Sequence, residues 1–222
     1  MKRSEINRAI SEAIIFTQEL NFSLPPFAFW TPDGWKAKTS EYDEIKDTML
    51  GWDVTDFGYS DFVSYGFVAF TIRNGSITND KYKKPYAEKI IISQENQITP
   101  FHFHSSKMED IINRGGGNLM IQLYNSTEEG EFSKCPVMVS VDGRNYEVPS
   151  GEIIRLKPGE SISLQQKLYH KFWAEQGHGS ILLGEVSTLN DDNTDNRFYE
   201  QSPRFTLIEE NEPAQYLLCN QY

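Results

Sequence analysis

The segment FHFHSSKMED, residues 101–110, carries the densest group of chemically active side chains in the sequence. In an extended strand, side chains two residues apart point to the same face, so His102 and His104 can reach one point together. Glu109 follows five residues later, and a third histidine, His170, lies well downstream. Two imidazoles and a carboxylate on neighbouring strands, joined by an imidazole from elsewhere, suit a divalent transition metal. We therefore predict a metal site here rather than two strand histidines that merely alternate with phenylalanines.

The strand in this segment is one of many that the sequence predicts. Short apolar and β-branched runs separated by turn residues indicate strands near 67–73, 89–93, 98–104, 108–113, 118–124, 137–141, 145–148, 152–156, 161–164, 169–174, 181–187 and 204–208. Asp142-Gly143 is a strong signal for a tight hairpin. Many short strands without helices between them indicate an antiparallel sandwich or a small barrel.

The N-terminal part differs from this pattern. Residues 4–21 predict a helix, with Ser4 as a possible cap and one apolar stripe that docks on the body of the protein or on a second subunit. Residues 40–50 predict a second, short helix. We expect an N-terminal helical extension and loop over 1–61, packed on a β-barrel domain over 62–222.

Composition narrows the functional classes. The chain has 222 residues, of which 38% are hydrophobic, and a net charge of −11, which argues against a nucleic-acid partner. It contains no apolar run of about 18 residues, so no membrane span is expected, and its basic start lacks the features of a secretory signal. The two cysteines, Cys135 and Cys219, lie far apart, which fits a reducing compartment. A cytoplasmic protein is the expectation.

Two segments resemble signatures of the cupin superfamily. The first is His102-x-His104-x4-Glu109-x6-Gly116, and the second is LKPGESISLQQKLYHKFW, which ends just beyond His170. The resemblance implies a double-stranded β-helix barrel of the jelly-roll type, in agreement with the predicted strands. Cupins include oxygenases, isomerases and non-catalytic sugar binders, so the fold alone leaves the function open.

Two longer segments are similar to the D-lyxose isomerase family. They are FHFHSSKMEDIINRGGGNLMIQLYN and LLGEVSTLNDDNTDNRFYE. This resemblance implies a metal-dependent aldose–ketose isomerase that interconverts D-lyxose and D-xylulose, and often D-mannose and D-fructose. It also implies manganese as the usual metal, held by His102, His104, Glu109 and His170. The ligand types would accept Zn, Fe, Co or Ni as well.

Isomerisation moves a hydrogen between C2 and C1, through a cis-enediol or a hydride shift. A positioned base must lie within hydrogen-bond reach of the migrating proton. Lys107 is one candidate, because strand alternation puts it on the face of Glu109, and a nearby cation would make its ammonium lose a proton more readily. Glu185 is the other, because a carboxylate inside a barrel is costly unless it is paired or functional. Which of the two is the base stays open.

Substrate contacts are less well marked in the sequence. Asp195 and Arg197 follow Glu185 in a loop and either bind sugar hydroxyls or pair with each other. Gln122 is expected to point inward from a strand. Trp30 and Phe172 could stack on a sugar face, although an aromatic residue is more often part of a core.

Other functions compete with the isomerase hypothesis. A cupin isomerase of sugar phosphates would need a phosphate cradle, an iron-dependent oxygenase would consume oxygen, and a non-catalytic sugar-binding cupin would bind without turnover. We also expect a homodimer, since small barrels leave sheet edges that a partner's N-terminal arm could cover.

Overall fold

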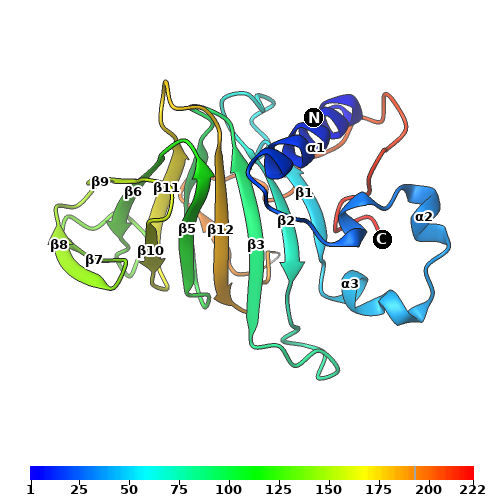
Figure 1. Ribbon diagram of the computed structural model, residues 1–222. Helices are drawn as coiled ribbons and strands as arrows, with labels where there is room; N and C mark the ends of the chain where they lie inside the picture. The colour runs from blue at the N-terminus through cyan, green and yellow to red at the C-terminus, as the bar shows by residue number, and fades with distance from the viewer. Residues whose placement is uncertain (193) are drawn as a thin grey trace.

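The computed structural model describes residues 1–192 and 194–222 (Figure 1). The helices are α1 (Arg3–Glu19), α2 (Pro32–Lys36) and α3 (Asp43–Asp47), with short 3₁₀ turns at Pro26–Phe29 and Ser40–Tyr42. The strands are β1 (Gly51–Thr55), β2 (Phe67–Arg73), β3 (Tyr86–Ser93), β4 (Thr99–His104), β5 (Glu109–Gly116), β6 (Leu119–Asn125), β7 (Val137–Val141), β8 (Arg144–Val148), β9 (Ile153–Leu156), β10 (Ser161–Leu164), β11 (Leu168–Ala174), β12 (Ile181–Thr188) and β13 (Asn196–Phe198). Among the described residues, no helix combines the length and hydrophobicity needed to cross a membrane.

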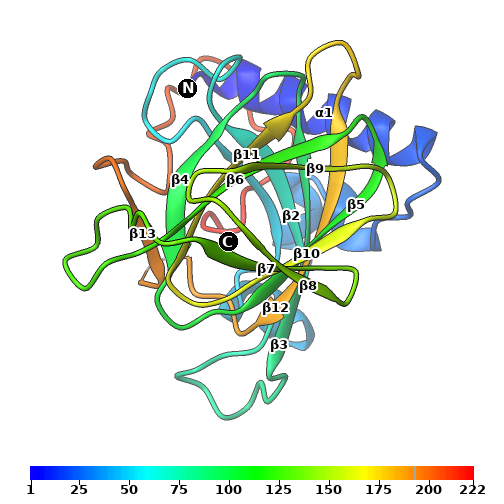
Figure 2. The ribbon, with the colours of Figure 1, turned by 90° about the vertical axis from the view of Figure 1, so that its left-hand side faces the viewer.

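The strands form two antiparallel sheets that curve around a common interior (Figure 2). One sheet has the order β1-β2-β3-β12-β5-β10-β7-β8, and the other has the order β13-β4-β11-β6-β9. Inward-facing side chains of both sheets form one apolar cluster, which includes Ile111 and Leu183 from the first sheet and Ile121 and Phe172 from the second. The predicted all-β, jelly-roll-like barrel with an N-terminal helix is therefore confirmed.

A second apolar layer lies outside the barrel, where α1 covers the first sheet. Along α1, Ile6, Ile10 and Ala13 recur at helical spacing and are almost fully buried. They face outward-pointing residues of the sheet such as Phe70 and Ile90. Because β2 and β3 are covered on both faces, each contains a continuous apolar run, FVAF at 67–70 and III at 90–92. The helix docks on its own barrel, as one of the two alternatives predicted.

Several local predictions were confirmed and others were wrong. The Asp142-Gly143 turn joins β7 to β8, and both residues have the positive φ that a two-residue hairpin requires. Ser4 does not begin the helix: Lys2 is the N-cap, and its N–H donates to the Glu5 carboxylate. The strand β1 pairs with β2, so the barrel's sheet begins before residue 62. No strand forms over 204–208.

That C-terminal segment instead crosses back to the N-terminal part of the chain. Arg3, which is 1% exposed, binds both carboxylate oxygens of Glu210 at 2.6 and 2.8 Å. The Thr55 hydroxyl donates to the carbonyl of Arg204, and Thr206 bonds to Asp56. These contacts hold Arg204 at one end of the barrel, close to the site described below.

We predict that the layer between α1 and the sheet contributes strongly to stability. Phe70 is 0% exposed and packs against Trp52, with ring centroids 4.8 Å apart. Phe70→Ala should lower the free energy of unfolding by about 3–5 kcal/mol, because it leaves a cavity that the core cannot fill. Met138→Ala is the control, since Met138 is 61% exposed and its loss should change stability by less than about 0.5 kcal/mol. Denaturant unfolding measures both; equal effects would contradict the prediction.

Candidate metal centre and active site

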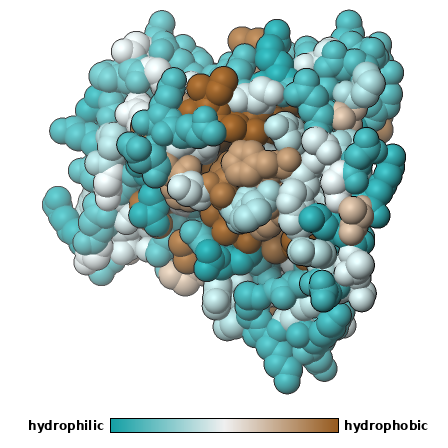
Figure 3. Space-filling view, turned by 45° about the vertical axis from the view of Figure 1, so that its right-hand side comes forward, coloured by the Kyte–Doolittle hydropathy of each residue, from teal (hydrophilic) through white to brown (hydrophobic). Residues whose placement is uncertain are grey.

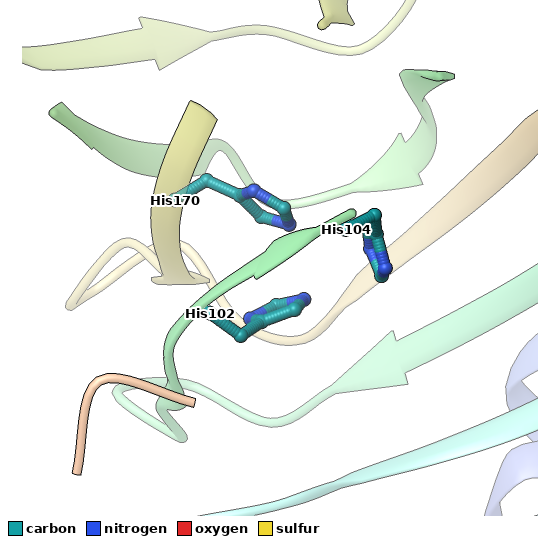
Figure 4. A group of neighbouring side chains, drawn as sticks. All are labelled: His102, His104 and His170. Carbon is teal, nitrogen blue, oxygen red and sulfur yellow. The ribbon is translucent and has the colours of Figure 1, made fainter. Parts of the chain in front are cut away.

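Three histidines meet inside the barrel (Figure 4). His102 and His104 lie two residues apart on β4, and His170 on β11 is the direct cross-strand partner of His102. Alternation along β4 sends Phe101 and Phe103 to the opposite face, where both pack against other aromatic rings. The pairing of β4 with β11 is thus what brings the distant third imidazole to the first two.

The three rings are oriented as metal ligands are. One ring nitrogen of each histidine lies within 4.8 Å of the corresponding nitrogen of the other two. The Nδ1 atoms of His102 and His170 lie 2.9 and 3.0 Å from the carbonyl oxygens of Pro100 and Leu168. A carbonyl can only accept, so both Nδ1 atoms must carry the proton, and in a neutral ring Nε2 then presents a lone pair.

Glu109 completes the group from the facing sheet, on β5, rather than from a strand next to β4 as the sequence suggested. Its Oε1 lies 3.2 Å from Nε2 of His170 and 3.4 Å from Nε2 of His104. Nε2 of His170 is buried without a hydrogen-bond partner among the described residues. A lone pair facing a carboxylate oxygen at this distance is unfavourable unless a proton or a metal cation lies between them. The donor set therefore fits a divalent cation.

The protonation states agree with that interpretation. Burial lowers the pKa of His102 well below its ordinary value, and the neighbouring imidazoles lower it further. Burial also lowers the pKa of His104, with Lys107 as the next cause. Although burial raises the pKa of Glu109, Lys107 and His104 outweigh it and hold that pKa well below the usual range. Neutral imidazoles and an ionised carboxylate are the forms that bind a metal.

Lys107 and Glu185 lie next to this group. The Lys107 ammonium is 2.7 Å from Oε2 of Glu109 and 2.7 Å from Oε1 of Glu185. Lys107 is in the loop before β5, not in a strand, and Asp195 holds that loop by accepting the backbone N–H groups of Ser106 and Lys107. The lowered pKa expected for Lys107 beside a bound cation stays a prediction, and the protein's own groups act in the opposite direction. Burial lowers it, but Glu109 and Glu185, which the sequence argument left out, outweigh burial and raise the pKa above its ordinary value.

These groups line a small cavity of about 30 Å³, enough for about two waters. Its charged lining residues are Lys89, Lys107, Glu109, Glu185, Asp192 and Arg204. Its apolar lining residues are Phe57, Phe67, Ile91, Ile111, Phe172 and Phe198.

The sequence analysis did not identify three of these charged residues, which are Lys89, Asp192 and Arg204. Lys89 Nζ lies 3.5 Å from Oε1 of Glu185 and 3.4 Å from Oδ2 of Asp192. Arg204 Nη2 lies 3.3 Å from Asp192 and 2.6 Å from Asp53 on β1. Burial raises the pKa of Asp192, but Arg204 and Lys89 outweigh it and hold that pKa well below the usual range. Lys89 stands directly beside the apolar run of β3, and this position in the sequence could have identified it as a candidate. The path of the C-terminal segment, which brings Arg204 to the site, could not have been found in the sequence.

Of the predicted substrate residues, two lie at or near the cavity and three lie away from it. Phe172 lines the cavity, and Asp195 lies behind His104, with its Oδ2 3.9 Å from Nδ1 of that ring. Arg197 is exposed: it pairs with Phe103 across β13 and β4, so it shares the outward face of that residue. Its guanidinium donates to the carbonyl of Glu129.

The inward orientation expected for Gln122 was also wrong. Gln122 lies between Ile121 and Leu123, which fill the core, and its amide donates to the carbonyl of Gly151 on the outer face of β6. Trp30 packs in the N-terminal extension against Trp35, with the Lys38 ammonium 3.7 Å from its ring centroid. The side to which each residue turns depends on strand register, which a short sequence window does not determine.

Comparisons with known proteins agree with this architecture. A family model described as D-lyxose isomerase matches residues 1–222. A D-lyxose/D-mannose isomerase of Escherichia coli O157:H7 is 47% identical, and one of Serratia proteamaculans is 46% identical, each over 100% of this chain and 98% of that protein.

Among solved structures, the L-ribose isomerase of Cellulomonas parahominis with L-psicose has a TM-score of 0.62 at 17% identity, covering 94% of this chain and 98% of that one. The L-ribose isomerase of Geodermatophilus obscurus has a TM-score of 0.61 at 16% identity and the same coverage. At such identities the likeness shows the fold alone. The match of the family model over the whole length, together with relatives near half identity, shows that the chain belongs to the D-lyxose isomerase family.

Proposed function

We propose that this chain is an aldose–ketose isomerase that interconverts D-lyxose and D-xylulose, and D-mannose and D-fructose. Membership of the family and the names of its relatives support the reaction and these sugars. The observation that carries the proposal is a single buried cavity in which three imidazoles and a carboxylate converge beside a lysine–glutamate pair. These are the groups that metal-assisted proton transfer requires.

The proposed ligands are His102, His104, Glu109 and His170, and the proposed metal is Mn²⁺. The orphaned Nε2 of His170 and the mixed nitrogen and oxygen donors support a divalent transition ion, and Zn, Fe, Co and Ni share these ligand preferences. When bound, such an ion supplies Lewis-acid polarisation of sugar oxygens.

We assign different roles to Lys107 and Glu185. Because Lys107 donates toward two carboxylates at 2.7 Å, it acts in this arrangement as a donor. It would donate a hydrogen bond to a sugar oxygen and stabilise the negative charge that develops there. Glu185 is the acceptor of the pair and would carry the proton between C2 and C1 through a cis-enediol. A hydride shift would need no base at C2, although a proton must still move from O2 to O1. Exchange of the migrating C2 hydrogen with solvent therefore discriminates between the two routes.

The cavity gives no support to a sugar phosphate as substrate. Each of its cations, Lys89, Lys107 and Arg204, already contacts at least one carboxylate. A phosphate would have to displace these carboxylates to be held. No feature of the described residues favours the oxygenase or the non-catalytic alternative over turnover of a free sugar.

A cytoplasmic location is proposed on one observation. Cys135 is exposed and Cys219 is buried, and neither forms a disulfide. Unpaired thiols are typical of a reducing compartment.

A substrate panel tests the proposed reaction. The purified protein with added Mn²⁺ should isomerise D-lyxose and D-mannose but not their phosphate esters. Treatment with a chelator should abolish the exchange and Mn²⁺ should restore it, because the polarisation of the sugar oxygens is lost and regained. Ketose formation measured by chromatography decides the outcome. Exchange that survives complete removal of metal, or a clear preference for phosphate esters, would contradict the proposal.

Two variants separate metal binding from proton transfer. His170→Ala should weaken metal affinity by more than the roughly 10–100-fold known for outer-shell partners, because it removes a direct ligand. Glu185→Gln should retain the metal and slow turnover by about 10²–10⁴-fold, the usual contribution of a general base. His178→Ala is the matched control, since His178 is a loop residue whose side chain is 45% exposed. Metal analysis and turnover are measured together; full activity of Glu185→Gln would refute its role.

We further propose a homodimer. Apolar side chains gather near the middle of one face, rimmed by hydrophilic ones (Figure 3). The N-terminal segment holds several apolar residues that are only partly buried, among them Phe16, Leu20 and Phe22. Such an area commonly marks a protein contact. Light scattering should give a mass near twice 25.6 kDa, and a monomeric mass would rule the dimer out.

A further inference from the structure

Lys89 is a buried lysine to which the proposed reaction assigns no role. It lies on β3, and its cross-strand partner on β12 is Glu185. Directly opposed residues share a face, so both side chains point into the barrel. Lys89 is 4% exposed, and its ammonium lies 3.5 Å from Oε1 of Glu185, the same oxygen that Lys107 contacts at 2.7 Å.

Lys89 also holds the loop that follows β12. Its ammonium donates to Oδ1 of Asn190 at 2.8 Å and lies 3.4 Å from Asp192. Oδ1 of Asn190 accepts from Lys107 as well, at 3.4 Å. The Asn74 side chain binds both the backbone N–H and the carbonyl of Asn190, at 3.2 and 2.9 Å. The loop is therefore tied to both lysines.

We propose that Lys89 is a positioning residue that acts through Glu185. Together with Lys107 it fixes one oxygen of the Glu185 carboxylate, and through Asn190 it ties that carboxylate to the loop beyond β12. This role rests on the proposed function, in which Glu185 transfers the proton. Proton transfer requires donor and acceptor within hydrogen-bond reach, so a carboxylate free to rotate would meet the substrate in the wrong geometry.

A purely structural role is a poor explanation for this lysine. Burying an ammonium is costly, and buried ion pairs can often be replaced by apolar residues without loss of stability. Here the carboxylates have other partners, because Glu185 also pairs with Lys107, and Asp192 also pairs with Arg204. Loss of Lys89 would leave neither carboxylate unpaired.

The test is a double-mutant cycle on the full-length, metal-loaded enzyme with D-lyxose. Lys89→Met should lower kcat by roughly 10–100-fold, the scale expected for a misplaced reacting group, with little change in KM or metal content. Lys89→Arg should recover part of kcat, because it restores the charge. In a Glu185→Gln background, Lys89→Met should change kcat by less than about twofold, because the group that it positions is gone.

Glu88→Gln is the matched control. Glu88 is the neighbour of Lys89 on β3 but points to the outer face, where it pairs with Arg73, so kcat should stay at the wild-type value. Asn190→Ala is the second variant, and it replaces Lys89→Met in the experiment if Lys89→Met does not fold. It removes the acceptor shared by both lysines and should also lower kcat, again without effect in the Glu185→Gln background.

The outcomes are distinguishable. Wild-type kcat in folded Lys89→Met, or in Asn190→Ala where Lys89→Met does not fold, would overturn the role of Lys89 alone. An equal fall in kcat in the wild-type and Glu185→Gln backgrounds would show that Lys89 does not act through that carboxylate. This result would also overturn the role of Lys89. A wild-type enzyme that does not isomerise D-lyxose at all would overturn the proposed function, and this inference with it.

Discussion

The lone pairs that meet inside the barrel are the constraint on which the rest of the site depends. Nδ1 of His170 faces the Leu168 carbonyl, so Nε2 of this ring is turned toward a Glu109 oxygen 3.2 Å away, and a lone pair there would repel that oxygen unless a proton or a metal cation lies between them. Burial intensifies this requirement, because charges in a protein interior are screened less than charges in bulk water. The Lys107 ammonium forms an ion pair with the other oxygen of Glu109, 2.7 Å away, and outweighs burial to hold the pKa of that carboxyl well below its usual range.

Opposite charges alternate outward from this point. The order is Glu109, Lys107, Glu185, Lys89, Asp192, Arg204 and Asp53, with each group contacting the next. These residues come from β5, the loop before it, β12, β3, the loop after β12, the C-terminal segment and β1. A buried charge is tolerated only when it is paired, so the network links the geometry of the proposed metal ligands to segments far from them in sequence. Stability for these charges comes from the two apolar layers around them, since the barrel core and the α1 layer exclude water from the sheet on both faces.

The lining of the cavity suits a sugar. Its charged side chains offer donors and acceptors for hydroxyl groups, and its apolar side chains, four phenylalanines among them, can contact the C–H surfaces of a carbon chain. Phe198 and Arg204 both belong to the stretch after β12, where β13 pairs with β4 and the carbonyl of Arg204 accepts from the Thr55 hydroxyl.

Local rules were sufficient for part of this protein. Alternation with a period of two placed His102 and His104 on one face, the Asp-Gly pair located a hairpin, and the strand pattern together with family resemblance led to the barrel. The same rules erred for Gln122 and Arg197, because which face of a strand turns inward is decided by its register with strands distant in sequence. Tertiary structure alone decided that β4 pairs with β11, that Glu109 arrives from the facing sheet, and that Arg204 returns from the C-terminal segment to meet Asp192. The contacts of His170 with His102 and Glu109 join residues about 60 to 70 positions apart, and Arg204 also meets Asp53 across about 150 positions. Only the packing of the whole chain, not any sequence window, brings such residues together.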